Sequence, residues 1–282
     1  MVNSKELLKQ AKLGNYAIPH FNINNLEWTR FILEECNENN SPVILGVSEG
    51  AAKYMGGYKV VNDMVRALVD SLKIKVPVVL HLDHGSLETC KEAIDAGFTS
   101  VMIDASKYSL EENIQMTGEV VSYAKGRNIS VEAEIGHVGG EEDGIADELA
   151  YAKVEDAIRL ALETGIDTLA PALGSVHGPY KGEPKLDFER MKEISLKTDL
   201  PLVLHGGSGI DDEKIKKAIS CGICKLNINT ELQMEWAKGV REFLNESDSV
   251  YDPRKIIKSG EKRMKEAIRM KIELLGSKDK AV

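Results

Sequence analysis

The sequence has 282 residues, of which 43% are hydrophobic and 29% are charged. This is the composition of an ordinary globular protein that can bury a sizeable core. The 36 Lys and Arg residues against 45 Asp and Glu residues give a net charge of −9, which argues against nucleic acid or an anionic membrane as a partner. No apolar run approaches the roughly 20 residues of a membrane-spanning helix, and residues 1–16 predict an amphipathic helix instead of a signal peptide.

The four cysteines are too sparse to indicate a disulfide framework. Cys221 and Cys224 form a C-x-x-C pair, but a zinc ribbon needs a second such pair, which the sequence lacks. We therefore predict structural thiols, with redox sensitivity as the alternative. Reduced thiols fit a cytoplasmic location.

In chain order, short β-branched segments bounded by turn residues predict eight strands. They cover residues 16–23, 42–48, 76–83, 100–105, 130–136, 168–174, 201–206 and 224–230. Several are apolar on both faces, as in PVVL and PLVL, which is typical of parallel strands covered on both sides. Helical segments lie between them, and several of these end in glycine, a common helix stop.

This alternation without a change in composition predicts an α/β fold, a single (β/α)8 TIM barrel over residues 1–282. A doubly wound open sheet is the alternative, but no G-x-G-x-x-G follows the first strand. The long, acidic, Gly-rich segment at residues 136–148 predicts a mobile lid. A C-terminal helical extension at about residues 231–275 exceeds what a barrel needs, and an oligomer contact is one use for it.

Three of the six histidines, His84, His177 and His205, lie at the ends of predicted strands 3, 6 and 7. Chemistry on this fold takes place at the carboxyl ends of the strands. Three imidazoles that converge there, with a fourth position left open, are typical of a catalytic zinc site. For the remaining histidines we predict that His20 and His81 support or pack within the barrel and that His137 is solvated.

Other polar residues also lie at, or just after, the carboxyl ends of predicted strands. They are Asn22, Asn24, Ser48, Asp83, Asp104, Glu134, Lys181, Asn227, Asn229 and Thr230. The Gly206-Gly207-Ser208 turn precedes a predicted helix, so backbone N–H groups and a helix N-terminus are available to a phosphate.

The alternation of side chains along a strand puts Glu132 on the face of Glu134, and Lys225 on the face of Asn227. If both faces point inward, Glu132 and Lys225 lie low in the barrel, and an ion pair between them, direct or through a third group, would limit the free-energy cost of burying them. Lys225 is then a structural residue and not a Schiff-base nucleophile.

The motifs HLDHG, DAS, VEAEIG, GGEEDG, LGSVHGPYKGEP, LVLHGGSG, NINTEL and YDPRK occur in this order over residues 81–255. Upstream, AIPHFNINN and SPVILGVSEGAAKYMGG belong to the same pattern. Over essentially its whole length the chain resembles the class II fructose-bisphosphate aldolases, which use zinc to cleave fructose 1,6-bisphosphate reversibly into dihydroxyacetone phosphate and glyceraldehyde 3-phosphate in glycolysis and gluconeogenesis.

The resemblance implies that His84, His177 and His205 bind one catalytic Zn²⁺. It implies an alternate metal position at Glu134 and, more weakly, at Asp104.

For the reaction itself, the resemblance implies that Asp83 exchanges a proton with the C4 hydroxyl and that Glu142, on the lid, removes the C3 proton of dihydroxyacetone phosphate. Asn227 is expected to hydrogen-bond the enediolate. Zinc acts as a Lewis acid for the ketone oxygen in such a site.

For substrate binding, the resemblance implies contacts of Asn24 and Ser48 with the sugar backbone. Arg254 is expected to reach the distal phosphate of a neighbouring subunit's substrate, which requires a homodimer or homotetramer. A monovalent cation, Na⁺ or K⁺, is expected beside the first phosphate. The residues expected to hold that phosphate are Gly178, Lys181, Gly206, Gly207, Ser208, Asn229 and Thr230.

Two alternatives stay open at this point. Tagatose-bisphosphate aldolase shares most of these motifs, although ILGVSEGAAKYMGG is more similar to the fructose enzymes, and the two substrates differ at one stereocentre. The other alternative is a sugar-phosphate or metal-binding barrel without turnover, against which Asp83 and Glu142 argue because a binding protein needs neither.

Overall fold

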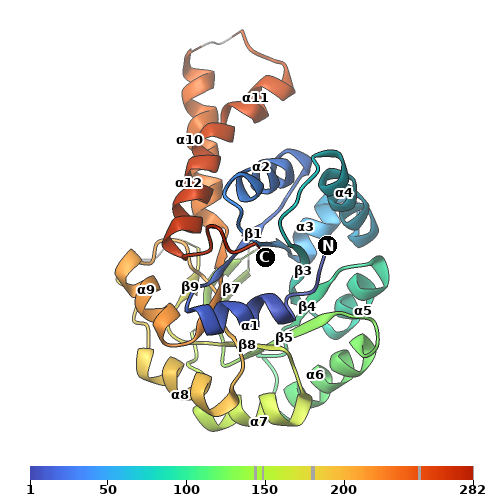
Figure 1. Cartoon of the computed structure of the whole chain (residues 1–282), viewed down its shortest axis with the longest axis vertical. Helices are drawn as coiled ribbons and strands as arrows, with labels where there is room; N and C mark the ends of the chain where they lie inside the picture. The colour runs from blue at the N-terminus through green and yellow to red at the C-terminus, as the bar shows by residue number, and fades with distance from the viewer. Residues whose placement is uncertain (143–144, 148, 179–181, 247–248, 282) are drawn as a thin grey trace.

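A computed structural model defines the fold (Figure 1). It describes residues 1–142, 145–147, 149–178, 182–246 and 249–281, with the backbone alone at residues 141–142 and 145–147. The predicted Lys181 lies outside the described residues.

Eight parallel strands close into a barrel in the order β1-β11-β10-β8-β5-β4-β3-β2. The strands are β1 (Ile18–Asn22), β2 (Val43–Val47), β3 (Val78–Gly85), β4 (Ser100–Ile103), β5 (Ser130–Ile135), β8 (Thr168–Pro171), β10 (Leu202–Leu204) and β11 (Ile223–Ile228). Each lies within, or within two residues of, a predicted strand. The predicted barrel is therefore confirmed, and the doubly wound open sheet is wrong because the sheet has no free edge.

Helices surround the barrel, as the ring of ribbons in Figure 1 shows. They are α2 (Leu26–Glu38), α3 (Glu49–Met55), α4 (Tyr58–Ser71), α5 (Leu87–Ala96), α6 (Leu110–Ala124), α7 (Val154–Thr164), α8 (Phe188–Thr198) and α9 (Asp212–Ser220). Capping residues mark where these helices begin and end, as α5 shows. Ser86 accepts a hydrogen bond from the Thr89 N–H at the start of α5, and Gly97 ends that helix with φ 99°.

The N-terminal helix α1 (Lys5–Gly14) lies across one end of the barrel (Figure 1). Leu8 and Ala11, both fully buried, pack in one cluster with Ile18 and Ile44 from the strands. This cluster closes the end of the barrel opposite the carboxyl ends of the strands, so the other end holds the site.

The segment predicted to form a mobile lid contributes two strands to a small three-stranded sheet, in the order β7-β6-β9, and its mobility stays a prediction. Strands β6 (Gly139–Glu142) and β7 (Ile145–Asp147) form an antiparallel hairpin, and β6 also pairs in parallel with β9 (Val176–His177). Gly140 has φ 107°, and a Cβ there would come within 2.2 Å of the His177 carbonyl oxygen. Only glycine permits this close backbone approach, so the hairpin sits directly against a predicted metal ligand.

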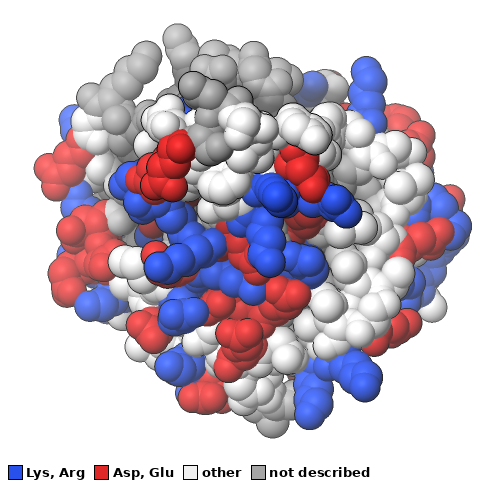
Figure 2. Space-filling model, turned by 90° about the horizontal axis from the view of Figure 1, so that it is seen from above, with Lys and Arg blue, Asp and Glu red and all other residues white. Residues whose placement is uncertain are grey.

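The C-terminal segment forms an arm of three helices, α10 (Thr230–Glu246), α11 (Pro253–Ser259) and α12 (Glu261–Leu274). The predicted last helical stretch breaks at Gly260, where a Cβ would lie 2.3 Å from the Trp236 ring. The arm projects from the barrel in Figure 1. Figure 2 views the molecule from the end of the arm and shows Lys and Arg side chains gathered among Asp and Glu side chains. None of the helices in the described parts of the chain combines the length and apolar character needed to cross a bilayer.

Candidate active site

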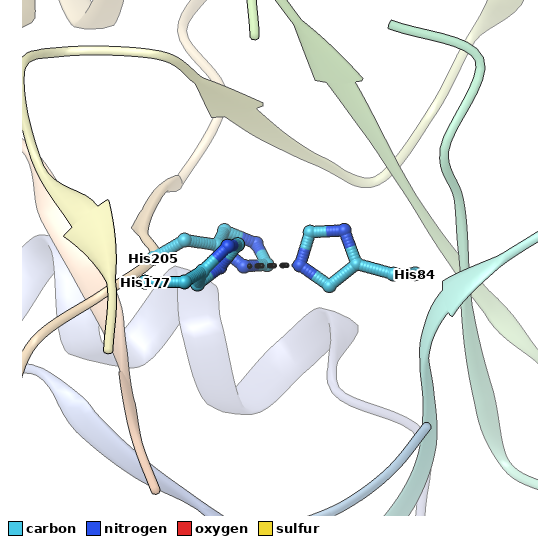
Figure 3. A group of neighbouring side chains, drawn as sticks. All are labelled: His84, His177 and His205. Atoms are coloured by element: carbon cyan, nitrogen blue, oxygen red, sulfur yellow. Dashed lines mark hydrogen bonds between the residues drawn. The ribbon is translucent and has the colours of Figure 1, made fainter. Parts of the chain in front are cut away.

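The structure brings His84, His177 and His205 together at the carboxyl ends of the strands (Figure 3). His84 is the last residue but one of β3, His177 lies on β9 and His205 directly follows β10. The ring centroid of His84 is 5.0 Å from that of His177 and 4.6 Å from that of His205, and the latter two are 5.8 Å apart. The three predicted ligands thus converge on one point, although their three strands are far apart in the sequence.

Carboxylates orient two of these rings. His84 Nδ1 donates to Asp104 Oδ2 at 2.8 Å, and His205 Nε2 donates to Glu132 Oε1 at 3.3 Å. In these tautomers His84 Nε2 and His205 Nδ1 are both acceptors, and they face each other at 3.0 Å, the contact drawn in Figure 3. Two nitrogen lone pairs that face each other suit a shared cation. Carboxylates behind the rings are the usual support for metal-bound histidines.

The electrostatics of these rings suit a metal. Burial, reinforced by the neighbouring imidazoles, holds the pKa of His177 well below its ordinary value. Burial also lowers the pKa of His205. Neutral imidazoles are the form that binds zinc. Tetrahedral zinc with Zn–N bonds of about 2.0–2.1 Å requires ligand nitrogens roughly 3.3 Å apart, close to the observed 3.0 Å. The donor set therefore fits a three-histidine zinc site.

A second group of possible ligands adjoins the first. Oxygens of Asp104 and Glu134 and a nitrogen of His84 all lie within 4.8 Å of one another. Burial raises the pKa of Glu134 well above its ordinary value, and the Asp104 carboxylate adds to this effect. Glu134 Oε2 is buried and, within the described structure, has no hydrogen-bond partner. A cation shared by the two carboxylates would relieve both effects.

Asp83 lies between the histidine cluster and a small cavity. Its Oδ2 accepts a hydrogen bond from Asn22 Nδ2 and its Oδ1 accepts one from Asn227 Nδ2, each at 3.1 Å. Burial opposes ionisation of Asp83, but the surrounding basic groups together outweigh it and hold the pKa of Asp83 well below its usual value. Asp83 is therefore an oriented carboxylate beside the predicted metal.

The small cavity has a volume of about 260 Å³ and polar walls. Gly206 lines the cavity and the predicted Gly207 does not, although a Cβ on either would collide with a carbonyl oxygen, of Val176 or Asn227. The cavity is lined by Asn22, Asp83, His177, Gly178, Gly206, Ser208, Asn227, Asn229, Thr230 and Gln233. The predicted phosphate-binding residues Gly178, Gly206, Ser208, Asn229 and Thr230 are thus brought to one place.

The helix N-terminus at this cavity differs from the predicted one. The helix after the Gly206–Ser208 turn, α9, is capped by its own Asp211, which accepts from the Glu213 N–H. The helix that reaches the cavity is α10, which begins at Thr230. The glycine-rich turn therefore predicted correctly that Gly206 lies at the cavity. The helix whose N-terminus reaches the cavity is not the one after this turn but α10, which follows the next barrel strand, β11.

A larger cavity of about 820 Å³ opens on the other side of the histidines. Ser48 lines it and also caps α3, where its Oγ accepts from the Ala51 N–H. Asn24 follows β1 and is half-buried, and its predicted substrate contact stays a prediction. Glu142 lies on β6, and its backbone alone is described, so its predicted role also stays a prediction.

The prediction that His137 is solvated is wrong. The ring is partly buried, and its Nδ1 lies 2.9 Å from Ser106 Oγ. Ser106 Oγ in turn donates to Asp104 Oδ1 at 2.7 Å. Because the backbone of His137 pairs with Ala150 at the base of the hairpin, these bonds link the lid to the carboxylate behind His84.

The predicted ion pair low in the barrel is present. Lys225 Nζ donates to both carboxylate oxygens of Glu132 at 2.8 Å. Lys225 also lies 3.2 Å from His81 Nε2, and His81 Nδ1 pairs with Ser100 Oγ at 2.8 Å. Glu132 joins this pair to the cluster above through His205, so the buried charges also support a predicted ligand.

Sequence reasoning missed the roles of Asn22, Ser106 and Glu132 as hydrogen-bond partners of site residues. A signal existed for one of them. Inward-facing positions alternate along β1, so His20 and Asn22 share the interior face. For Ser106, the contact with Asp104 is local, two residues apart in the chain, whereas its second partner, His137, comes from another segment that no local pattern indicates.

Comparisons with known proteins identify the family of the chain. Residues 2–280 match the family model described as fructose-bisphosphate aldolase class-II. The chain is 56% identical to a fructose-bisphosphate aldolase of Geobacillus stearothermophilus over 283 aligned positions, which cover 100% of this chain and 99% of that one. It is 55% identical to a fructose-bisphosphate aldolase of Staphylococcus aureus strain N315, with the same coverage.

Two solved structures have the same fold. The YdjI aldolase of Escherichia coli K12 superposes with a TM-score of 0.86 at 35% identity and covers 100% of this chain and 99% of its own. A fructose-bisphosphate aldolase of Campylobacter jejuni superposes with a TM-score of 0.85 at 28% identity and covers 99% of this chain and 96% of its own.

Proposed function

Because the chain belongs to the class-II fructose-bisphosphate aldolase family, we propose that it cleaves fructose 1,6-bisphosphate reversibly into dihydroxyacetone phosphate and glyceraldehyde 3-phosphate. The observation that carries this proposal is the meeting of His84, His177 and His205 beside Asp83, at the boundary between two cavities. A carbon–carbon cleavage needs both a stabilised carbonyl oxygen and a positioned proton acceptor.

The family depends on zinc, and His84, His177 and His205 are the residues that would hold the ion. A bound zinc supplies Lewis-acid stabilisation of the negative charge that develops on the ketone oxygen. Glu134 and Asp104 offer the alternate position, supported by the raised pKa of Glu134.

The proton transfers fall to two carboxylates. Asp83 takes the proton of the C4 hydroxyl during cleavage and returns it during condensation, and Asn22 and Asn227 fix the direction in which its oxygens point. Glu142, carried on β6, removes or returns the proton at C3. Its place on the hairpin allows substrate to enter before the base approaches and water is excluded.

Substrate is held at both ends. Gly206, Gly207, Ser208 and neighbouring residues bind the first phosphate in the 260 Å³ cavity, with Lys181 and a monovalent cation beside it. Ser48 in the larger cavity, and Asn24, contact the sugar backbone.

Arg254 serves a second subunit. Its side chain is 89% exposed and lies on the arm, paired only locally with Asp252 among the described residues. An arm that projects from its own barrel fits delivery of a guanidinium to a neighbouring site, so the active form is a homodimer or larger.

A cytoplasmic location is supported by the cysteines, which are free thiols. Burial raises the pKa of Cys224 to about 12, so this member of the C-x-x-C pair is a poor thiolate, and a structural role is favoured over redox sensitivity.

The first test is a cleavage assay on metal-depleted and zinc-reconstituted protein. Depleted protein is expected to be inactive and zinc to restore triose phosphate release, because zinc supplies the stabilisation of charge on the ketone oxygen. Activity that persists after verified metal removal contradicts the proposal. The same assay on fructose and tagatose 1,6-bisphosphates, compared by kcat/KM, identifies the preferred epimer, for which we propose fructose. Binding of bisphosphate without cleavage favours the binding-module alternative.

A second test concerns Arg254. Arg254→Ala is expected to raise KM for the bisphosphate about 10- to 100-fold, the effect of losing a hydrogen bond to a charged group, while Lys255→Ala, at the next exposed position of α11, leaves KM unchanged. Mixing Arg254→Ala subunits with inactive Asp83→Ala subunits should restore activity, because each hybrid contains one site with both residues intact. If Arg254 acts in its own subunit, mixing gives no gain.

A further inference from the structure

His20 is a buried polar side chain with no hydrogen bond. It lies on β1 with 0% exposure, and among the described residues neither ring nitrogen has a hydrogen-bond partner. A buried polar group without a partner costs about 1–3 kcal/mol of stability, so such groups are rare. The proposed function as argued above gives His20 no task.

The barrel makes room for this ring. Gly46 faces it from β2, and a Cβ at Gly46 would lie 2.1 Å from both Cε1 and Nε2 of His20. The φ of Gly46 is not in the left-handed region, so backbone conformation does not require glycine there. The His20 imidazole requires glycine at position 46, because any side chain there would collide with the ring.

The neighbours of His20 leave one candidate partner. His81 meets the ring edge-on, with centroids 5.5 Å apart, but both nitrogens of His81 already pair, with Ser100 and with Lys225. The Lys225 ammonium also disfavours a metal ion shared by His20, His81 and Asp83. The remaining group is Asp83, whose Oδ2 lies 3.8 Å from His20 Nε2.

We propose that His20 is a positioning residue for Asp83, and that its Nε2–H donates to Asp83 Oδ2 when Asn227 turns from Asp83 to the substrate. The inference rests on the proposed roles of Asp83 and Asn227. In the present structure Asn227 donates to Asp83 Oδ1, so engaging substrate removes one of the two amide donors that hold the carboxylate.

The required movement is small. An N–H···O bond has a usual length of about 2.9 Å, so an approach of roughly 0.9 Å from the present 3.8 Å completes it. Burial lowers the pKa of His20 to about 3, so the ring is neutral and keeps one N–H to donate. Asn22 continues to donate to Asp83 Oδ2. The bond from His20 to this oxygen then gives the carboxylate a second donor again, after Asn227 has left Oδ1.

The test compares His20→Met, which fills the space without an N–H, with His20→Gln, whose amide can donate. For His20→Met we expect kcat to fall about tenfold, KM to change less than twofold, zinc content to stay at wild type and the Tm to hold or rise. His20→Gln should recover most of kcat. Ile18→Met places the same side chain two residues earlier on the interior face of β1, where Ile18 is fully buried, and should keep wild-type kcat.

A purely structural His20 gives the opposite pattern, in which His20→Met lowers the Tm and leaves kcat unchanged, and this overturns the proposal. An inactive wild type would count against the proposed function instead. In that case the ¹⁵N shifts of the His20 ring decide the inference. A protonated Nε2 whose shift changes in Asp83→Ala supports it, and a protonated Nδ1 with no response contradicts it. The same spectra serve if His20→Met does not fold.

Discussion

Replacing Asp83 by alanine is expected to lower kcat for bisphosphate cleavage about 10³-fold, within the 10²- to 10⁴-fold range typical of a lost general base. The carboxylate is 1% exposed and held by Asn22 and Asn227, so no other described group stands in the same orientation. Alanine removes the proton acceptor but none of the three histidines. The variant should therefore bind zinc as wild type does.

Steady-state kinetics, zinc content and circular dichroism of the variant measure these effects together. Asp95→Ala is the matched control, because it removes a carboxylate from the exposed end of α5, where it pairs with Arg127. The control should retain full activity. Wild-type turnover in Asp83→Ala, with zinc bound, would refute the assigned role. Glu142→Ala is expected to lose activity in the same way, since it removes the base at C3.

Replacing Lys225 by methionine is expected to lower the free energy of unfolding by about 3–5 kcal/mol, the usual effect of leaving a buried charge without its partner. Lys225 and Glu132 are 1% and 2% exposed. Burial works against ionisation of Glu132, and chiefly the Lys225 ammonium holds its pKa below the ordinary value. Without that ammonium, Glu132 must either stay charged in the barrel or take up a proton.

Urea unfolding at neutral pH, on proteins of equal metal content, measures the loss. Lys225→Met combined with Glu132→Gln should recover most of the stability, because the second change removes the orphaned charge and keeps an oxygen for His205. Lys59→Met, which breaks an exposed ion pair with Asp63 on α4, should have no measurable effect. A Lys225→Met protein as stable as wild type would show that the pair contributes nothing.

The barrel could be predicted from the sequence because its signals are local. Alternating strand and helix segments, with glycines such as Gly97 and Gly165 at helix ends, define each unit without knowledge of the others. The convergence of His84, His177 and His205 followed from the same logic, since all parallel strands end on one side of the barrel. The Glu132–Lys225 pair followed from side-chain alternation.

The remainder depends on contacts between distant segments. The lid is a sheet because β6 pairs with β9, some 35 residues later, and no local pattern shows that pairing. The partner of His137 is Ser106 on another loop. The last helical stretch breaks at Gly260, where the Trp236 ring of α10 leaves no room for a side chain. Each of these features depends on a contact between segments that are distant in the sequence, so the local sequence does not indicate it.

The shared ladder of β6 and β9 has a mechanical consequence. Gly140 and His177 are paired residues in adjacent strands, so the hairpin cannot swing as a rigid flap without dragging the imidazole or breaking the backbone bonds between the two strands. The predicted opening of the lid would leave His177 in place only if Gly139 and Gly140 stayed paired with β9. A chimera that exchanges this hairpin between relatives would also have to exchange residues 176–177. Otherwise the imported β6 would lack the β9 strand with which it pairs.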